Sequence, residues 1–151
     1  MAMDVDMERA LLDLSNLGFE GSDVYLAEII PAVEMAWCDG VIQPEERATL
    51  EAYCEDLTGR LNREAQAPFF TRGRALFLLD LLSVRRLLPA QRQGALRALK
   101  TWSGEGPCGA TMRRRIVAWA EAVAVVTGHP AWDTRELFWL QTMRRTFELV
   151  P

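Results

Sequence analysis

The chain has 151 residues with a formal net charge of −4; half of them are hydrophobic and a quarter are charged. These proportions are typical of one compact globular domain and exclude the fibrous, disordered and collagen-like classes. A domain of this size buries roughly 70% of the surface that its unfolded chain exposes, so it needs no metal or disulfide merely to hold it together. We therefore expect any bound metal to serve a function.

The net charge conceals an uneven distribution along the chain. Residues 1–66 contain 15 acidic and 4 basic residues, whereas residues 67–151 contain 6 acidic and 13 basic residues. This split predicts either that the two halves fold against each other with complementary charges, or that each presents a charged surface to a partner. The net acidity argues against general nucleic-acid binding.

The cysteines and the apolar runs of the sequence indicate where in the cell the protein resides. Cys38, Cys54 and Cys108 form no Cys-x-x-Cys pair, and an odd number leaves one thiol unpaired, as in reduced cytoplasmic proteins. We expect all three to be buried as small apolar side chains. The acidic N-terminus does not resemble a secretory signal. The apolar run at 76–88 is interrupted by charges and too short to span a bilayer. The sequence predicts a cytoplasmic protein that is not transmembrane, with peripheral membrane contact left open.

Apolar residues recur at helical spacing almost throughout the chain, and no stretch alternates as a strand would. The sequence therefore predicts an all-α single domain over residues 1–151, a bundle of about seven helices. The predicted helices begin and end near residues 4–17, 23–38, 44–59, 72–88, 89–104, 111–127 and 134–147.

Particular residues mark several of these boundaries. Pro31 predicts a kink within the second helix, and Pro44 suits the first position of the third. Asp133 and Glu136 form a capping-box pair at the start of the seventh helix. A glycine-rich loop is expected between the fifth and sixth helices, at Gly104, Gly106 and Gly109. Its Gly-x-Gly-x-x-Gly spacing does not indicate a dinucleotide site, because no strand precedes it.

An acidic turn between the second and third helices is the main candidate for a functional site. Asp39, Gly40 and Glu46 match positions 5, 6 and 12 of an EF-hand calcium loop. Positions 1 and 3 fall on Met35 and Trp37, which offer no carboxylate. The pattern therefore excludes an ordinary EF-hand.

The same turn resembles a motif of the TerB-like family of tellurite-resistance and stress-response domains, Ala-x-Ala-Asp-Gly-x-Ile-x-x-x-Glu. Residues 35–46 read Met-Ala-Trp-Cys-Asp-Gly-Val-Ile-Gln-Pro-Glu-Glu, with Cys38 in place of an alanine. The close match covers residues 29–57. The resemblance implies a helical bundle of two related halves, a cytoplasmic and non-enzymatic role in stress-response assemblies, and divalent-metal binding through Asp39 and Glu46.

A faint second copy of the motif lies near the C-terminus. Residues 119–128 precede the seventh helix much as residues 31–40 precede the third, and Thr127 occupies the position of Asp39. Glu136 follows its turn glycine by eight residues, whereas Glu46 follows by six. This pattern predicts two pseudo-repeated halves, of which only the first keeps its turn carboxylate.

Two carboxylates are too few to hold calcium, magnesium or zinc tightly, so further ligands must converge on Asp39 and Glu46. Glu34 is the candidate third ligand. Asp80 and Glu121 also interrupt apolar helices, where an unpaired charge is costly. These carboxylates either meet in a pocket or pair with arginines. Asp39 and Glu46 can equally be ordinary turn and cap residues.

Two further surfaces are candidates for partner binding. Arg113, Arg114 and Arg115 are expected in the opening turns of the sixth helix, where they oppose the helix dipole and favour an anion or simply face solvent. Trp132 and Trp139 lie at the start of the seventh helix, where they form either a partner surface or part of the core.

The sequence thus predicts a non-enzymatic TerB-like module for tellurite resistance or stress response. It would bind a divalent metal weakly and contact a protein partner or a second copy of itself. His129, the only histidine, has no cysteine or aspartate beside it, so no nucleophile and base are indicated. The alternatives are a metal-dependent enzyme that uses clustered carboxylates, and a pure scaffold.

Overall fold

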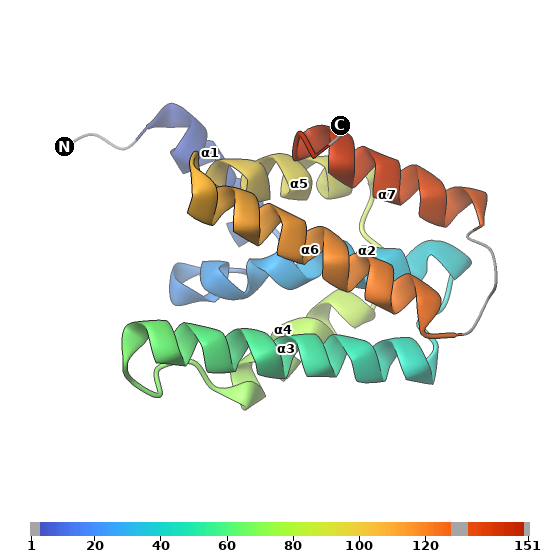
Figure 1. Cartoon of the computed structure of the whole chain (residues 1–151), viewed down its shortest axis with the longest axis horizontal. Helices are drawn as coiled ribbons and strands as arrows, with labels where there is room; N and C mark the ends of the chain where they lie inside the picture. Colours follow the sequence, from blue (N-terminus) through green and yellow to red (C-terminus); the bar gives the residue numbers. More distant parts are fainter. Residues whose placement is uncertain (1–3, 128–132, 150–151) are drawn as a thin grey trace.

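The structure is a computed structural model that describes residues 4–127 and 133–149. Over these residues the chain is an all-α single bundle without strands, as the sequence predicts (Figure 1). Seven α-helices and two 3-10 segments follow in order: α1 (Val5–Ser15), η1 (Gly21–Ile29), α2 (Ile30–Ala36), η2 (Trp37–Asp39), α3 (Pro44–Ala65), α4 (Arg72–Ser83), α5 (Pro89–Ser103), α6 (Pro107–Val125) and α7 (Thr134–Thr146).

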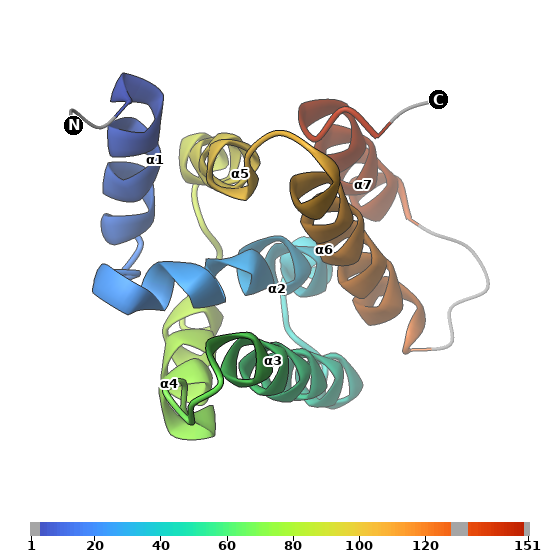
Figure 2. The same cartoon turned by 60° about the vertical axis from the view of Figure 1, so that its left-hand side comes forward.

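Helix α2 crosses the middle of the molecule, between α5 and α6 on one side and α3 and α4 on the other (Figure 2). Every residue of α2 is buried. Helix α1 packs along α5, and α2 packs along α6. These are the pairs that would be equivalent if the chain consisted of two related halves. The arrangement is compatible with the repeat, which stays a prediction.

The second predicted helix is divided into three pieces. A 3-10 segment leads to Ile29, α2 begins at Ile30, and a second 3-10 segment ends at Asp39. Pro31 lies at the beginning of α2, where its missing N–H costs least. The proline therefore marks the change of helix type rather than a kink within one α-helix.

Helices α3 and α4 differ in length from the prediction. Helix α3 continues through Gly59 to Ala65, and Gln66 ends it with a left-handed backbone at φ 56°. Helix α4 ends at Ser83, five residues before the predicted end. Leu88 has an extended backbone because the residue before a proline avoids the helical region, so a helix reaching Leu88 is disfavoured.

Helix α6 begins at Pro107, about one turn earlier than expected, so Gly109 lies in its first turn and not in the loop. Cys108 lies beside it and is exposed, which corrects the expected burial of all three cysteines. Cys38 and Cys54 are buried, and burial raises the pKa of each thiol to about 12. No described helix is long and apolar enough to cross a membrane.

The acidic first half and the basic second half of the sequence form ion pairs with each other within the fold. Arg74 donates to Asp23 through Nε and Nη2, and Arg115 binds Glu28 with an Nη2 to Oε1 distance of 3.0 Å. Both pairs join the acidic first half to the basic second half. At least part of the charge split is therefore explained by complementary faces within one molecule.

Candidate functional site

The acidic turn closes one end of the bundle. Asp39 ends η2, and Gly40 follows with φ 86°, a left-handed conformation that a residue with a Cβ rarely adopts. The Gly40 N–H donates to the Trp37 carbonyl at 2.8 Å. In Figure 1 this turn lies at the right-hand end of the molecule, together with the beginnings of α3 and α7.

Glu46 belongs to the N-terminus of α3. Its Oε1 accepts a hydrogen bond from the Gln43 backbone N–H at 2.8 Å, as the glutamate of a capping box does. The side chain is buried, although it carries a carboxyl group. Its pKa is raised to about 7, first by burial and then by the nearby carboxyl groups of Asp39 and Glu136, while the hydrogen bond from Gln43 opposes the rise.

The start of α7 repeats this construction. The Glu136 N–H donates to Asp133 Oδ1 at 2.8 Å, and the Asp133 N–H donates to Glu136 Oε1 at 3.1 Å, which confirms the capping box seen in the sequence. Glu136 is buried like Glu46. The hydrogen bond from the Glu136 N–H lowers the pKa of Asp133, and Asp39 and Arg135 contribute in the same direction.

Arg135 connects the two acidic segments. Its Nη2 lies 3.9 Å from Asp39 Oδ1 and 3.7 Å from Asp133 Oδ2. We name the set Asp39, Glu46, Asp133 and Glu136 the acidic end. Sequence reasoning placed Asp133 and Glu136 in a cap but missed that this cap adjoins the acidic turn. The weak repeat of turn and capped helix was the only signal that could have indicated it.

The acidic end is not a preformed metal cage. Among the described residues, no three His, Cys, Asp or Glu side chains are arranged to hold a metal ion. Glu34, the expected third ligand, therefore does not complete such a group with Asp39 and Glu46. It lies within the buried helix α2, where Arg92 Nη1 is 3.8 Å from its Oε1.

Glu34 is an unusual side chain for the centre of a bundle. It is 1% exposed, and neither carboxylate oxygen has a fully formed hydrogen bond to any residue that the structure describes. Burial raises its pKa to about 7, and the Leu87 backbone, Arg92 and Arg86 oppose this only in part. Glu34 therefore holds a proton more readily near neutral pH than an ordinary glutamate does.

Unfolding free energy is expected to fall as the pH rises from about 4.5 to about 7, the ordinary and folded pKa values of Glu34 and Glu46. In this range the folded state holds protons that the unfolded state has released. Glu34→Gln should reduce the change by on the order of 1–2 kcal/mol. Urea denaturation of both proteins at pH 5, 6, 7 and 8 measures how the unfolding free energy changes with pH. Asp80→Asn, at an exposed carboxylate, is the control and should leave the slope intact. An unchanged slope in Glu34→Gln would contradict the assignment.

Asp80 and Glu121 pair with arginines. Arg47 Nη2 lies 2.7 Å from Asp80 Oδ1, and Arg144 Nη2 lies 3.0 Å from Glu121 Oε1. Glu34 lies inside the bundle, so among the described residues the three carboxylates do not form the cluster that a metal-dependent enzyme of the alternative type requires.

The three consecutive arginines have three different environments. Arg113 Nη1 donates to Ser103 Oγ and to the Gly104 carbonyl, so it closes the end of α5. Arg115 binds the buried Glu28, whereas Arg114 is exposed. Since α6 begins at Pro107, all three lie beyond its first turn, where the dipole effect is small. They do not form one anion patch.

The aromatic residues of the last helix are also separated. Trp139 is buried and its indole Nε1–H donates to the Pro31 carbonyl at 2.9 Å, so it belongs to the core rather than to an exposed surface. Phe138 is the exposed aromatic residue of α7, at 68%. Trp132 lies outside the described residues.

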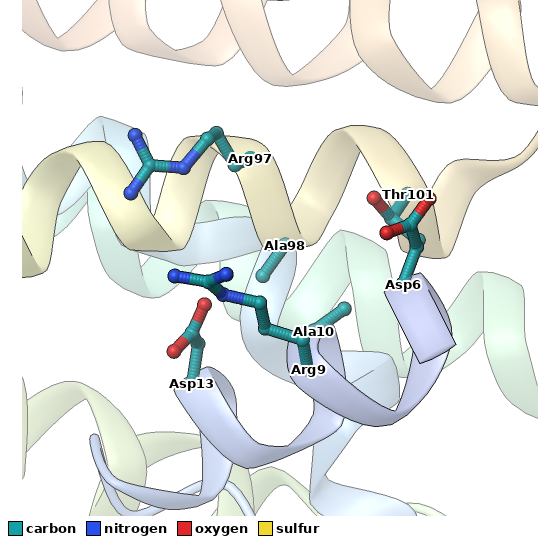
Figure 3. A pocket seen from close by; sticks show the side chains of 7 residues that line it. All are labelled: Asp6, Arg9, Ala10, Asp13, Arg97, Ala98 and Thr101. Carbon is teal, nitrogen blue, oxygen red and sulfur yellow. The ribbon is translucent and has the colours of Figure 1, made fainter. Parts of the chain in front are cut away.

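Two hollows lie on the surface of the bundle. One, of about 250 Å³, lies between α1 and α5 and is lined by Asp6, Arg9, Asp13 and Arg97 among others. Figure 3 shows these side chains around it, with both charges present. The other, of about 460 Å³, lies between the start of α5 and α7, beside the acidic end. Its lining includes Arg135, which also approaches Asp39.

Comparisons of the chain with family models, curated proteins and solved structures gave no match. The likeness to TerB-like domains therefore stays a prediction, based on the match over residues 29–57 and on the helical plan.

Proposed function

We propose that the chain is a non-enzymatic TerB-like module of cytoplasmic stress response or tellurite resistance, and that its acidic end is the working surface. One observation carries the proposal: four carboxyl groups from two distant parts of the sequence lie at one end of the bundle, namely Asp39, Glu46, Asp133 and Glu136. The absence of catalysis belongs to the same proposal.

The acidic end would bind a divalent cation weakly. Repulsion among its carboxyl groups already favours protonation of Glu46, and a cation would relieve that repulsion. Glu46 and Glu136 each use an oxygen to cap a helix, and Arg135 supplies positive charge nearby. A cation must compete with these contacts. Calcium, magnesium and zinc are the candidates, since each accepts carboxylate ligands.

Calorimetric titration of the metal-free protein with calcium, magnesium, manganese and zinc tests this proposal. We expect one ion per chain with a dissociation constant on the order of 10⁻⁴ to 10⁻³ M. Asp39→Asn with Glu46→Gln should abolish the heat of binding, because it removes charge but keeps side-chain shape. The matched control is Asp80→Asn with Glu121→Gln, which removes the same charge from two exposed carboxylates. Absence of binding in the intact protein would leave the acidic end as turn and cap residues.

A protein-interaction role is the second candidate, and the exposed Phe138 beside the acidic end favours it. Exposed aromatic side chains next to charged groups are typical of contact surfaces. Sedimentation velocity of the same samples, with and without cation, reports association with a second copy. If the chain is a pure scaffold, Asp39→Asn should leave association unchanged.

A further inference from the structure

The 460 Å³ hollow between α5 and α7 has a chemical character of its own. Its lining includes Arg86, Arg92 and Arg135, together with Pro89, Phe138 and Trp139, and it includes no acidic residue. We name it the arginine–aromatic pocket. A larger cavity of about 660 Å³ between α3 and α6 is lined by Glu28 and Glu64 as well as Arg60 and Arg115, so its charges balance and indicate no ligand class.

The arginines of the pocket are compensated to different degrees, since Arg135 lies near Asp39 and Asp133, whereas Arg86 and Arg92 share the buried Glu34. Arg86 Nε is buried and has no hydrogen-bond partner among the described residues. The pKa of Arg92 is lowered, first by burial and then by the positive charge of Arg86. Arg92 Nη1 donates to the Leu87 carbonyl and lies 3.8 Å from Glu34 Oε1. A buried donor without an acceptor and two repelling cations are both relieved by an anion.

The aromatic side of the pocket supplies an apolar surface. Phe138 is 68% exposed, so it lies outside the core and can pack against a ligand. The Trp139 N–H is already used by the Pro31 carbonyl, so this residue offers its ring and not its donor. A hollow of this size that combines aromatic rings with polar and charged groups is typical of sites for small organic ligands.

We propose that the arginine–aromatic pocket binds a small organic acid, with its carboxylate on Arg86 and Arg92 and its apolar body against Phe138 and Trp139. A planar carboxylate matches the fork of a guanidinium and can accept two hydrogen bonds from it. This inference goes beyond the proposed function and does not depend on a cation at the acidic end, because its ligand is an anion and none of its residues is a carboxylate of the acidic end.

Titration with 3-phenylpropionate tests the proposal, with its neutral amide as the matched probe. Binding is followed in ¹H–¹⁵N spectra by the indole N–H signals, of which Trp139 should shift. We expect the amide to bind at least about ten-fold more weakly than the acid, because it lacks the charge. Inorganic phosphate should not reproduce the shift of Trp139, since it has no apolar body.

Variants separate the two parts of the site. Arg86→Gln should weaken binding of 3-phenylpropionate by about ten-fold or more, and Phe138→Ala by several-fold. Arg114→Gln is the control, since Arg114 is exposed on another surface of the molecule. Arg86→Lys keeps the charge without the fork and should bind at an intermediate level. Thermal unfolding of each variant is the control that tests whether the fold is retained.

Three results would overturn the proposal. The first is equal binding of the acid and its amide, and the second is unchanged binding of the acid in Arg86→Gln. The third is the absence of binding by 3-phenylpropionate while an acidic peptide shifts the Trp139 signal, which would make the pocket a peptide-docking surface.

Discussion

Glu28→Gln is expected to lower the free energy of unfolding by on the order of 3–5 kcal/mol, because it removes the buried carboxylate that joins Arg115, Arg60 and Tyr53. The Glu28 carboxylate accepts hydrogen bonds from Arg115 Nε at 3.1 Å and Nη2 at 3.0 Å, and from the Tyr53 hydroxyl at 2.8 Å. Arg60 Nη1 lies 3.8 Å from it. Without the negative charge, Arg115 loses this ion pair and the nearby Arg60 keeps its pair with Asp56, at 3.2 Å. Urea denaturation with the linear extrapolation measures the change.

Glu121→Gln provides a matched control for this variant. The Glu121 to Arg144 pair has the same 3.0 Å distance between Nη2 and Oε1 as the Glu28 to Arg115 pair. The Glu121 side chain is 39% exposed, whereas that of Glu28 is 3% exposed. Solvent screens the exposed pair, so this substitution should cost no more than about 1 kcal/mol.

Equal losses of unfolding free energy in Glu28→Gln and Glu121→Gln would contradict the role of burial. If Glu28→Gln does not fold, Glu28→Asp keeps the charge and tests the geometry alone. We expect Glu28→Asp to retain part of the stability, since a shorter carboxylate still neutralises Arg115 but does not reach both partners.

The helical fold was largely predictable because helical spacing of apolar residues is a local signal. Boundaries set by side-chain capping, such as Asp133 with Glu136, were found correctly. Boundaries set by the surroundings were not. Gly59 lies within α3 because packing of the flanking turns outweighs its weak helix preference, and Gly109 lies within α6 because Pro107 begins that helix.

The candidate site was only partly predictable. Asp39 and Glu46 are close in sequence, so their shared turn could be inferred. The partners that decide their chemistry, Asp133, Glu136 and Arg135, come from a helix almost a hundred residues later. Which residues meet across such a distance depends on packing, and periodicity alone does not specify it.

The arginines show the same limit. Three neighbouring guanidinium groups at 113–115 suggested one patch, but a helix turns each successive side chain by about 100 degrees, so they face three directions. Arg86 and Arg92 lie in different segments and drew no attention in the sequence. They become interesting only because the fold places both beside Phe138.

Gly109→Ala should destabilise the protein by about 3 kcal/mol, because no side-chain movement can make room for the added methyl group. A Cβ at this position would lie 2.3 Å from the Gly104 carbonyl oxygen and 2.6 Å from that of Ser103, and both atoms belong to the backbone. The end of α5 or the start of α6 must therefore shift. That shift would also disturb the hydrogen bond from Arg113 to the Gly104 carbonyl. We expect the melting temperature to fall by roughly 10 °C.

Gly73→Ala is the matched control, since Gly73 also lies in the first turn of a helix, α4, but has open space around its Cβ position. That substitution should be neutral or raise stability by up to about 1 kcal/mol, because alanine favours the helix. Changes in unfolding free energy of opposite sign in the two variants, measured by thermal and urea unfolding, would establish close backbone approach as the reason for glycine at 109. A harmless Gly109→Ala would show instead that the α5–α6 connection can open, and that the contact between Arg113 and Gly104 does not fix it.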